Sequence, residues 1–108
     1  MQHKDLTIER WGRRPLVEQL ANIGSEVFRA INWQEKGNKS YAVLAFHRAL
    51  ELTDCTLAQP LRKPEFRELA RMREMLVDYF FGENIYSSTA SSWKSYFMAF
   101  TFAATQTR

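Results

Sequence analysis

The spacing of the apolar residues limits this chain more than any other feature, because they recur every three or four positions in four successive segments. In the first segment these residues are Leu16, Leu20, Ile23, Val27 and Ala30. This spacing places their side chains on one face of an α-helix. The expected helices span residues 15–36, 39–58, 64–81 and 89–104, with no sheet. Four helices joined by short loops favour an all-α fold, an antiparallel four-helix bundle.

Composition agrees with a single helical domain. The 108 residues include only 4 Gly and 3 Pro, which leaves little turn chemistry for a protein of many short strands. We expect residues 15–108 to form the bundle domain and residues 1–14 to be an N-terminal segment that leads into it. Trp11, with Leu6 and Ile8, is expected to cover one end of the core.

Cysteine usage and hydropathy indicate the compartment. Cys55 is the sole cysteine, so the chain forms no internal disulfide, and a reducing compartment suits it. No apolar run follows the charges of Lys4 and Asp5, and a run of 18 apolar residues occurs nowhere. We therefore expect a cytoplasmic protein with neither a signal peptide nor a membrane span.

One charged residue interrupts the apolar stripe of residues 64–81. The stripe contains Phe66, Leu69, Ala70, Leu76, Val77 and Phe80, and Arg73 falls near its middle. A guanidinium keeps its charge, so its burial requires a carboxylate, a group of carbonyls or a bound anion. We expect Arg73 to be largely buried and paired with Asp54, or with Glu51 as the second choice. The alternative is that Arg73 holds an anionic ligand inside the bundle.

The chain lacks the residue patterns of common catalytic and metal sites. His47 and Cys55 are separated by about 12 Å along a helix, too far for one to activate the other, and His3 lies in the terminal segment. There is no Cys-x-x-Cys, no histidine pair at helical spacing, no Glu-x-x-His element and no glycine-rich phosphate loop. We therefore expect a protein that is not an enzyme and that binds no metal or cofactor.

The charge balance permits nucleic-acid binding without favouring it. The net charge is +3, from 15 basic and 12 acidic residues, many of which alternate along the same expected helix faces. The aromatic run Tyr79-Phe80-Phe81, continued by Tyr86 and Trp93, has the rings to stack on bases. The charges beside it are Asp78 and Glu83, which repel phosphate. Core packing at a helix end is therefore the favoured interpretation of this run.

The segment 89–104 is apolar on two sides. Its core face contains Trp93, Tyr96, Phe97, Phe100 and Ala104. Met98 and Phe102 point the other way, and because a peripheral helix of a four-helix monomer has one core to face, these two side chains need a second partner. We expect a homodimer through Met98 and Phe102, with Leu44 and Met75 widening the contact. The competing explanation is that this surface is covered by Leu6, Ile8 and Trp11.

Part of the chain resembles a tetratricopeptide unit. The small, aromatic, Gly, Ala, aromatic and Ala positions of that motif match Ala30, Trp33, Gly37, Ala42, Phe46 and Ala49. The phrase Arg48-Ala49-Leu50-Glu51-Leu52 is typical of its second helix. Glu26 and Arg29 stand where the motif has apolar residues, Asp54 replaces its proline, and no second copy follows, whereas a solenoid needs about three. The resemblance therefore implies shared helix-hairpin packing rather than a repeat protein.

Two further resemblances supply no activity. The segments 9–11, 20–26 and 73–80 look like those of small prokaryotic helical proteins of unknown function. The bundle layout is similar to that of HEPN domains of defence and toxin systems, whose ribonucleases carry an Arg shortly before a His on one helix. Neither His3 nor His47 closely follows an Arg, so the likeness implies no nuclease activity.

The favoured function is therefore a small non-catalytic helical protein-interaction module, an adaptor or regulator, that self-associates. The alternative is a nucleic-acid-binding or HEPN-like accessory domain of a defence or toxin system.

Overall fold

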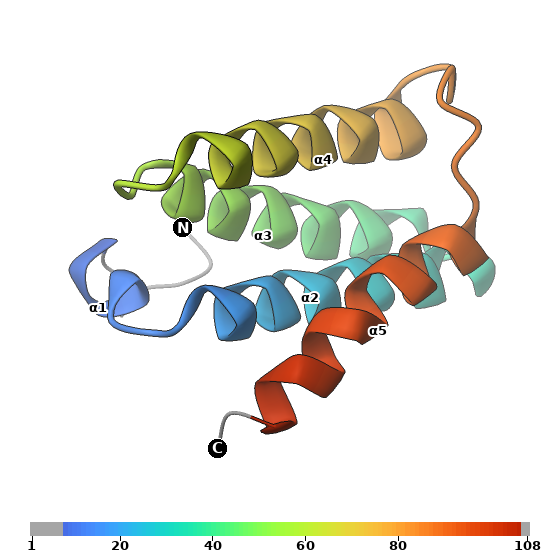
Figure 1. Cartoon of the computed structure of the whole chain (residues 1–108). Helices are drawn as coiled ribbons and strands as arrows, with labels where there is room; N and C mark the ends of the chain where they lie inside the picture. The colour runs from blue at the N-terminus through green and yellow to red at the C-terminus, as the bar shows by residue number, and fades with distance from the viewer. Residues whose placement is uncertain (1–7, 107–108) are drawn as a thin grey trace.

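The computed structural model describes residues 8–106 and folds them into five α-helices, with no strand among them (Figure 1). The helices are α1 (Ile8–Gly12), α2 (Leu16–Glu35), α3 (Lys39–Leu57), α4 (Lys63–Phe81) and α5 (Ala90–Gln106). The predicted all-α class is confirmed, and each end of the four long helices lies within two residues of its expected position. None of the described helices is both long and apolar enough to cross a membrane.

Polar side chains and one glycine explain where the helices begin and turn. The Asn38 side chain accepts a hydrogen bond from the Tyr41 N–H at 3.1 Å and caps α3. At the start of α5, Thr89 Oγ1 accepts from the Ser92 N–H and Ser92 Oγ accepts from the Thr89 N–H, both at 2.9 Å. Gly37 turns the chain between α2 and α3 with a φ of +79°, a left-handed conformation that suits glycine.

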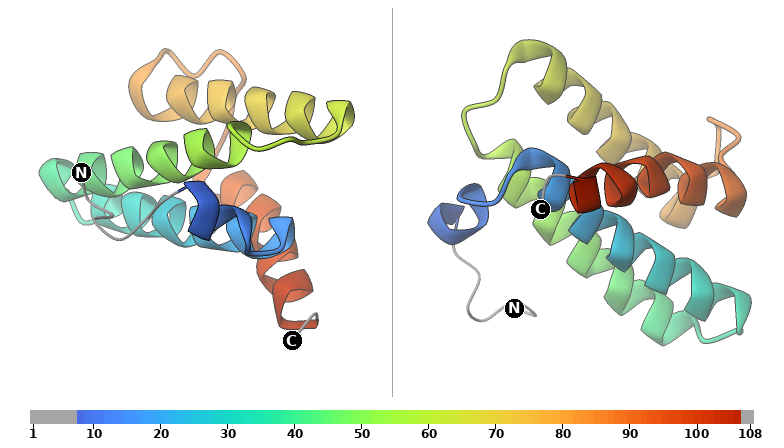
Figure 2. Two further views of the ribbon diagram at one scale, coloured as in Figure 1. Left: turned by 90° about the vertical axis from the view of Figure 1, so that its left-hand side faces the viewer. Right: turned by 60° about the horizontal axis from the view of Figure 1, so that its bottom comes forward.

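Helix α2 is the centre of the fold. It packs closely against α3 on one side and is crossed obliquely by α5, while α4 packs on α3 (Figures 1 and 2). All four long helices contribute to the core, whose largest fully buried side chains include Ile23, Ile31, Phe46, Leu69, Leu76 and Phe97. Where α2 and α5 cross, Gly24 faces Phe97, and the missing side chain lets the two helices approach closely.

Helices α4 and α5 do not close the fold against each other. In a closed four-helix bundle each helix packs on two neighbours, whereas here α4 packs on α3 and α5 packs on α2. The two helices diverge from the loop of residues 82–89 that joins them (Figure 1). The Asp78 carboxylate fixes this loop by accepting hydrogen bonds from the N–H groups of Ile85 and Tyr86. The fold is therefore four packed helices with an open side between α4 and α5.

Helix α1 packs on α3 through Trp11, whose side chain lies in the core as expected. The Trp11 indole N–H donates to Thr56 Oγ1 at 2.8 Å, and the Thr56 hydroxyl donates to Gln19 Oε1 at 3.0 Å. Gln59 Nε2 donates to the same Gln19 oxygen at 2.6 Å. The network satisfies polar groups that are buried at this end of the core. Leu6 and the side chain of Ile8, which were expected beside Trp11, lie outside the described residues.

Candidate functional site

Arg73 lies against Asp54 between α4 and α3. Arg73 Nε donates to Asp54 Oδ1 at 2.6 Å, and Arg73 Nη2 donates to Asp54 Oδ2 at 3.3 Å, so the contact is a two-point ion pair. The predicted burial is wrong, because 37% of the Arg73 side chain and 55% of the Asp54 side chain are exposed. The buried residues of α4 are Leu69, Met72 and Leu76, so the covered face is centred to one side of Arg73, which lies at its solvent-facing edge. An anion held by Arg73 would therefore not lie inside the bundle.

Glu51 takes no part in that ion pair. Its Oε2 atom is buried and has no hydrogen-bond partner among the described residues. Its negative charge acts on Cys55, whose pKa is raised first by burial of the thiol and then by the charges of Asp54 and Glu51. This raised pKa favours the protonated thiol over the thiolate, which is the nucleophilic form.

The two residues that we expect at a dimer interface lie exposed on α5. Met98 is 54% and Phe102 is 65% exposed. Trp11 packs against α3 instead, so it does not cover them. Leu44 is exposed as expected, but the expectation that Met75 faces outward is wrong, because Met75 is half-buried and lines a cavity between α4 and α5. Residues 95–106 carry no charge, so this outer face of α5 is apolar or neutral throughout.

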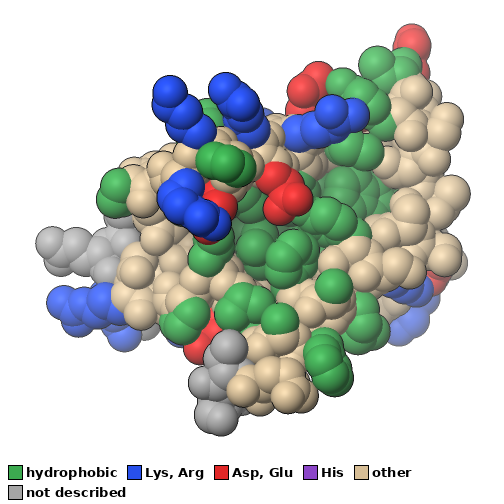
Figure 3. Space-filling view, viewed as in Figure 1, with side chains coloured by type: hydrophobic (Ala, Val, Ile, Leu, Met, Phe, Trp, Pro, Cys, Tyr) green, Lys and Arg blue, Asp and Glu red, His purple; other side chains and the backbone are tan. Residues whose placement is uncertain are grey.

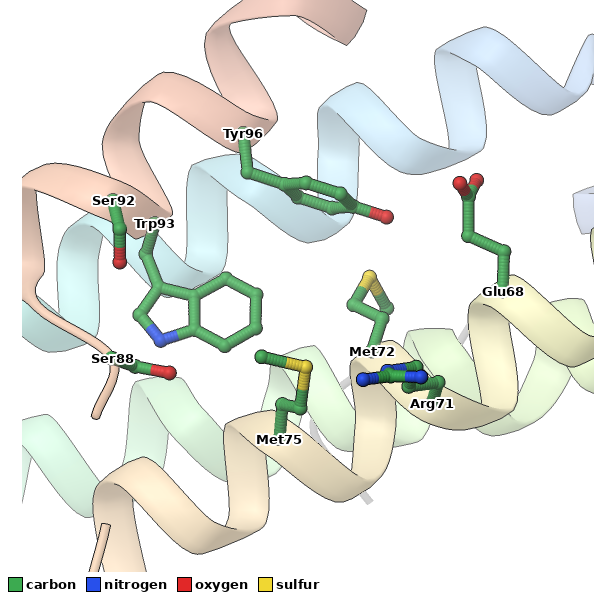
Figure 4. Close-up of a pocket in the computed structure, with 8 residues that line it drawn as sticks. All are labelled: Glu68, Arg71, Met72, Met75, Ser88, Ser92, Trp93 and Tyr96. Atoms are coloured by element: carbon green, nitrogen blue, oxygen red, sulfur yellow. The ribbon is translucent and has the colours of Figure 1, made fainter. Parts of the chain in front are cut away.

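The open side between α4 and α5 contains a cavity of about 330 Å³, which we call the α4–α5 cavity. From α4 it is lined by Glu68, Arg71, Met72 and Met75. From α5 and the residues before it, the lining is Ser88, Ser92, Trp93 and Tyr96 (Figure 4). Hydrophobic side chains dominate the surface between the two helices (Figure 3). The cavity is therefore apolar inside and polar at its rim, as binding pockets generally are.

Two polar atoms in the wall of the α4–α5 cavity have no hydrogen-bond partner among the described residues. They are Trp93 Nε1 and Tyr96 Oη, and both atoms are buried. Figure 4 shows the indole nitrogen of Trp93 on the side of the ring that faces Ser88, and the Tyr96 hydroxyl pointing toward the end of the cavity where Glu68 lies. Burial, and secondarily the Glu68 charge, raise the pKa of Tyr96 to about 12, so its hydroxyl stays protonated at neutral pH.

The aromatic rings of α5 hold these two groups in position. The rings of Trp93 and Phe97 stack with centroids 5.9 Å apart, and the Tyr96 ring meets the Phe97 ring edge to face at 5.0 Å. Phe97 is fully buried against α2, so it anchors both neighbours. The arrangement presents hydrogen-bonding groups and an apolar floor in fixed positions, which suits binding.

Sequence reasoning placed Trp93 and Tyr96 in the core and missed the cavity. The periodicity of α5 shows which residues are apolar, but it does not show that α4 diverges and leaves one edge of that face uncovered. The breadth of the apolar face was the available signal, since Trp93, Phe97 and Ala104 are buried while Tyr96 and Phe100 at its edge are half-buried.

Other candidate groups are not brought together. His47 is exposed and lies against Phe81, with ring centroids 5.8 Å apart, and His3 lies outside the described residues. Among residues 8–106 no group of three or more His, Cys, Asp or Glu side chains is placed to hold a metal ion. No protein-family model, curated protein or solved structure matches this chain.

Proposed function

We propose that this protein is a non-catalytic protein-interaction module and that an amphipathic helix of a partner protein docks in the α4–α5 cavity. The observation that carries the proposal is the open side of the fold. Helices α4 and α5 each pack on one neighbour and leave an apolar cavity between them. A helix laid between two diverging helices buries its apolar face in the way that helix-in-groove complexes do.

The side chains of the cavity suit a protein partner. Met72 and Met75 form its floor on α4, and methionine side chains adapt to the shape of what they contact. Trp93 and Tyr96 lie opposite, and these two residue types are enriched among the residues that dominate interface energies. Glu68 and Arg71 supply one charge of each sign at the rim, which favours a partner helix that carries both signs.

Site-specific photo-cross-linking tests this proposal. A photoreactive amino acid at Glu68, an exposed residue that lines the cavity, should cross-link one protein in extract of the source cell. The same amino acid at Glu83, an exposed glutamate that does not line it, is the matched control. Adding Met75→Glu should abolish the product at Glu68 while circular dichroism shows unchanged helicity. A product that survives Met75→Glu, or no product at all, would contradict the proposal.

A second candidate function is nucleic-acid binding by the outer face of α4. Lys63, Arg67 and Arg71 are all exposed and follow one another at steps of one helical turn, with the exposed ring of Phe66 beside them. Figure 3 shows basic side chains gathered along the edge of the molecule over α4. Basic residues interleaved with aromatic rings are the pattern of single-stranded nucleic-acid sites.

Titrating a labelled single-stranded RNA with the protein tests nucleic-acid binding by α4 separately from partner docking in the α4–α5 cavity. Binding through α4 should weaken steeply as salt rises and should be lost in Arg67→Glu. Met75→Glu, on the cavity side of α4, should leave RNA binding unchanged. Absence of binding at low salt would remove the nucleic-acid and HEPN-like accessory alternative.

A further inference from the structure

The indole N–H of Trp93 is a buried donor that the described part of the chain leaves unused. Trp93 is 5% exposed, and its Nε1 atom has no hydrogen-bond partner. Buried polar groups are nearly always paired, because removing a donor from water without a replacement acceptor is costly. An unpaired indole N–H in the wall of a cavity therefore points to a group that enters the cavity.

Trp11 shows how the same fold treats an indole with a purely structural role. It is buried to a similar extent, and its Nε1 donates to Thr56 Oγ1 at 2.8 Å. Each of these tryptophans lies beside hydroxyl-bearing residues, but only Trp11 has one in bonding position among the described residues. The difference between the two residues is that Trp93 lines the α4–α5 cavity.

We infer that the α4–α5 cavity recognises an apolar group that carries a hydrogen-bond acceptor, and that Trp93 Nε1 donates to that acceptor. An indole nitrogen is a donor only, so the bound atom must be an oxygen or another acceptor. Met72, Met75 and the Trp93 ring surround the apolar part of the group. The inference rests on the proposed function, and the group is a side chain of the partner helix with an apolar stem and an oxygen near its end.

Tyr96 supports the same ligand chemistry at the other end of the cavity. Its buried hydroxyl also has no partner among the described residues, and it points away from Trp93 toward the Glu68 end (Figure 4). A protonated phenol both donates and accepts, so it pairs with a polar atom at the outer end of an occupant. The wall therefore has an obligatory donor at its Ser88 end and an adaptable group at its Glu68 end.

Proton–nitrogen correlation spectra of the indole groups test the inference directly. The chain has 3 Trp, so three indole signals are expected, and Trp93→Phe identifies the one from Trp93. If Trp93→Phe does not fold, Trp11→Phe and Trp33→Phe assign the signals by elimination. The probes are acetophenone and α-methylstyrene, which have the same shape but carry an oxygen and a CH₂ group respectively at the same position.

Acetophenone should move the Trp93 indole proton to lower field, as a new hydrogen bond does, whereas α-methylstyrene should produce only a small ring-current shift. The Trp11 signal should stay in place with both probes, because its N–H is already bonded. Equal shifts from both probes would overturn acceptor recognition while leaving the cavity as an apolar docking site. If neither probe shifts the Trp93 indole signal, the inference is wrong. Cross-linking at Glu68 would still test the proposed function independently.

Two further measurements test whether Trp93 Nε1 already has a hydrogen-bond partner in the isolated protein. Ser88→Ala should leave the Trp93 indole signal of the unbound protein unchanged, since no hydrogen bond joins these two side chains. A large shift to higher field would show that Ser88 is the partner of Trp93 and would overturn the inference. Native mass spectrometry should show the bare chain mass. A bound small molecule that Trp93→Phe releases would overturn the assignment to a partner side chain.

Discussion

Gly24 and Phe97 meet where α2 and α5 cross, so closely that a Cβ atom on Gly24 would lie 2.7 Å from the Cβ of Phe97. No pair of real side chains packs at that distance. Phe97 is fully buried and its Cβ is fixed to the α5 backbone, so it has no room to yield. The absence of a side chain at position 24 therefore sets how α5 lies across α2, and with it the width of the α4–α5 cavity.

Gly24→Ala should destabilise the protein. Alanine in the middle of a helix normally gains about 1 kcal/mol over glycine, but overpacking a tight core costs about 1–3 kcal/mol. The difference between these two terms is a fall of up to about 2 kcal/mol in the free energy of unfolding, which urea titrations measure. Ser25→Ala, at the exposed neighbouring position, is the control and should change stability by only a few tenths of a kcal/mol. A Gly24→Ala protein more stable than the wild type would contradict the close contact.

Breaking the Arg73–Asp54 pair should cost little. Because both side chains remain well exposed, water screens the pair, and exposed ion pairs contribute about 0.2–1 kcal/mol. Arg73→Ala should therefore lower the free energy of unfolding by less than about 1 kcal/mol. A double-mutant cycle with Asp54→Ala measures the interaction alone. A coupling of about 3 kcal/mol or more would indicate a buried pair and contradict the observed exposure.

Ionisation of the Tyr96 hydroxyl should lower the stability of the protein at alkaline pH. The hydroxyl's folded-state pKa of about 12 lies above the ordinary tyrosine value, so its stabilising contribution is complete below about pH 10 and is lost as pH rises toward 12. The pKa values of Tyr79 and Tyr86 are also raised, but only that of Tyr96 is raised to about 12, so the last tyrosine to titrate at the tyrosinate absorbance band should be missing from Tyr96→Phe. The urea midpoint of Tyr96→Phe should also fall less between pH 10 and pH 12 than that of the wild type. Identical titrations in the two proteins would show that another tyrosine is responsible.

The outer face of α5 should mediate self-association. Burying a large apolar side chain contributes about 1.5–3 kcal/mol. Because this face is uncharged, two copies of it can meet in a symmetric dimer without repulsion between like charges. Light scattering at micromolar concentration should give about twice the 12.7 kDa of one chain. Phe102→Glu should reduce the particle to a monomer with its helicity retained. Ile85→Glu, at an exposed loop position outside α5, should leave the dimer intact, and a monomeric wild type would rule out this interface.

The helices were predictable from the sequence because each depends on local spacing. Thr89 begins α5 as a cap, and the stripe from Leu16 to Ala30 follows the buried face of α2. The choice of Asp54 as the partner of Arg73 also followed from helix faces that had to meet. The exposure of this pair did not, because it depends on how far α3 covers the stripe of α4, and periodicity contains no information on the width of a contact.

The α4–α5 cavity depends on a relationship between elements that no single helix encodes. Met75 and Tyr96 are apolar and helically spaced whether or not their helices converge, so their pattern is the same in a closed bundle and in an open one. Asp78 holds the loop through the backbone N–H groups of Ile85 and Tyr86, and these bonds constrain the path of the chain between α4 and α5. The sequence shows a carboxylate there but not the loop around it.

The buried network around Trp11 also determines when α1 can be fixed in place during synthesis. Trp11 precedes its acceptor Thr56 by 45 residues, and Gln19 precedes Gln59 by 40. In a nascent chain the Trp11 indole N–H and the Gln19 side-chain oxygen therefore lack these partners until the end of α3 has emerged from the ribosome. Since chains grow from the N-terminus at about 5–20 residues per second, α1 waits several seconds for the residues that hold it in place. Helix α1 is thus fixed in place only after α3 has been made, although it precedes α3 by more than 25 residues.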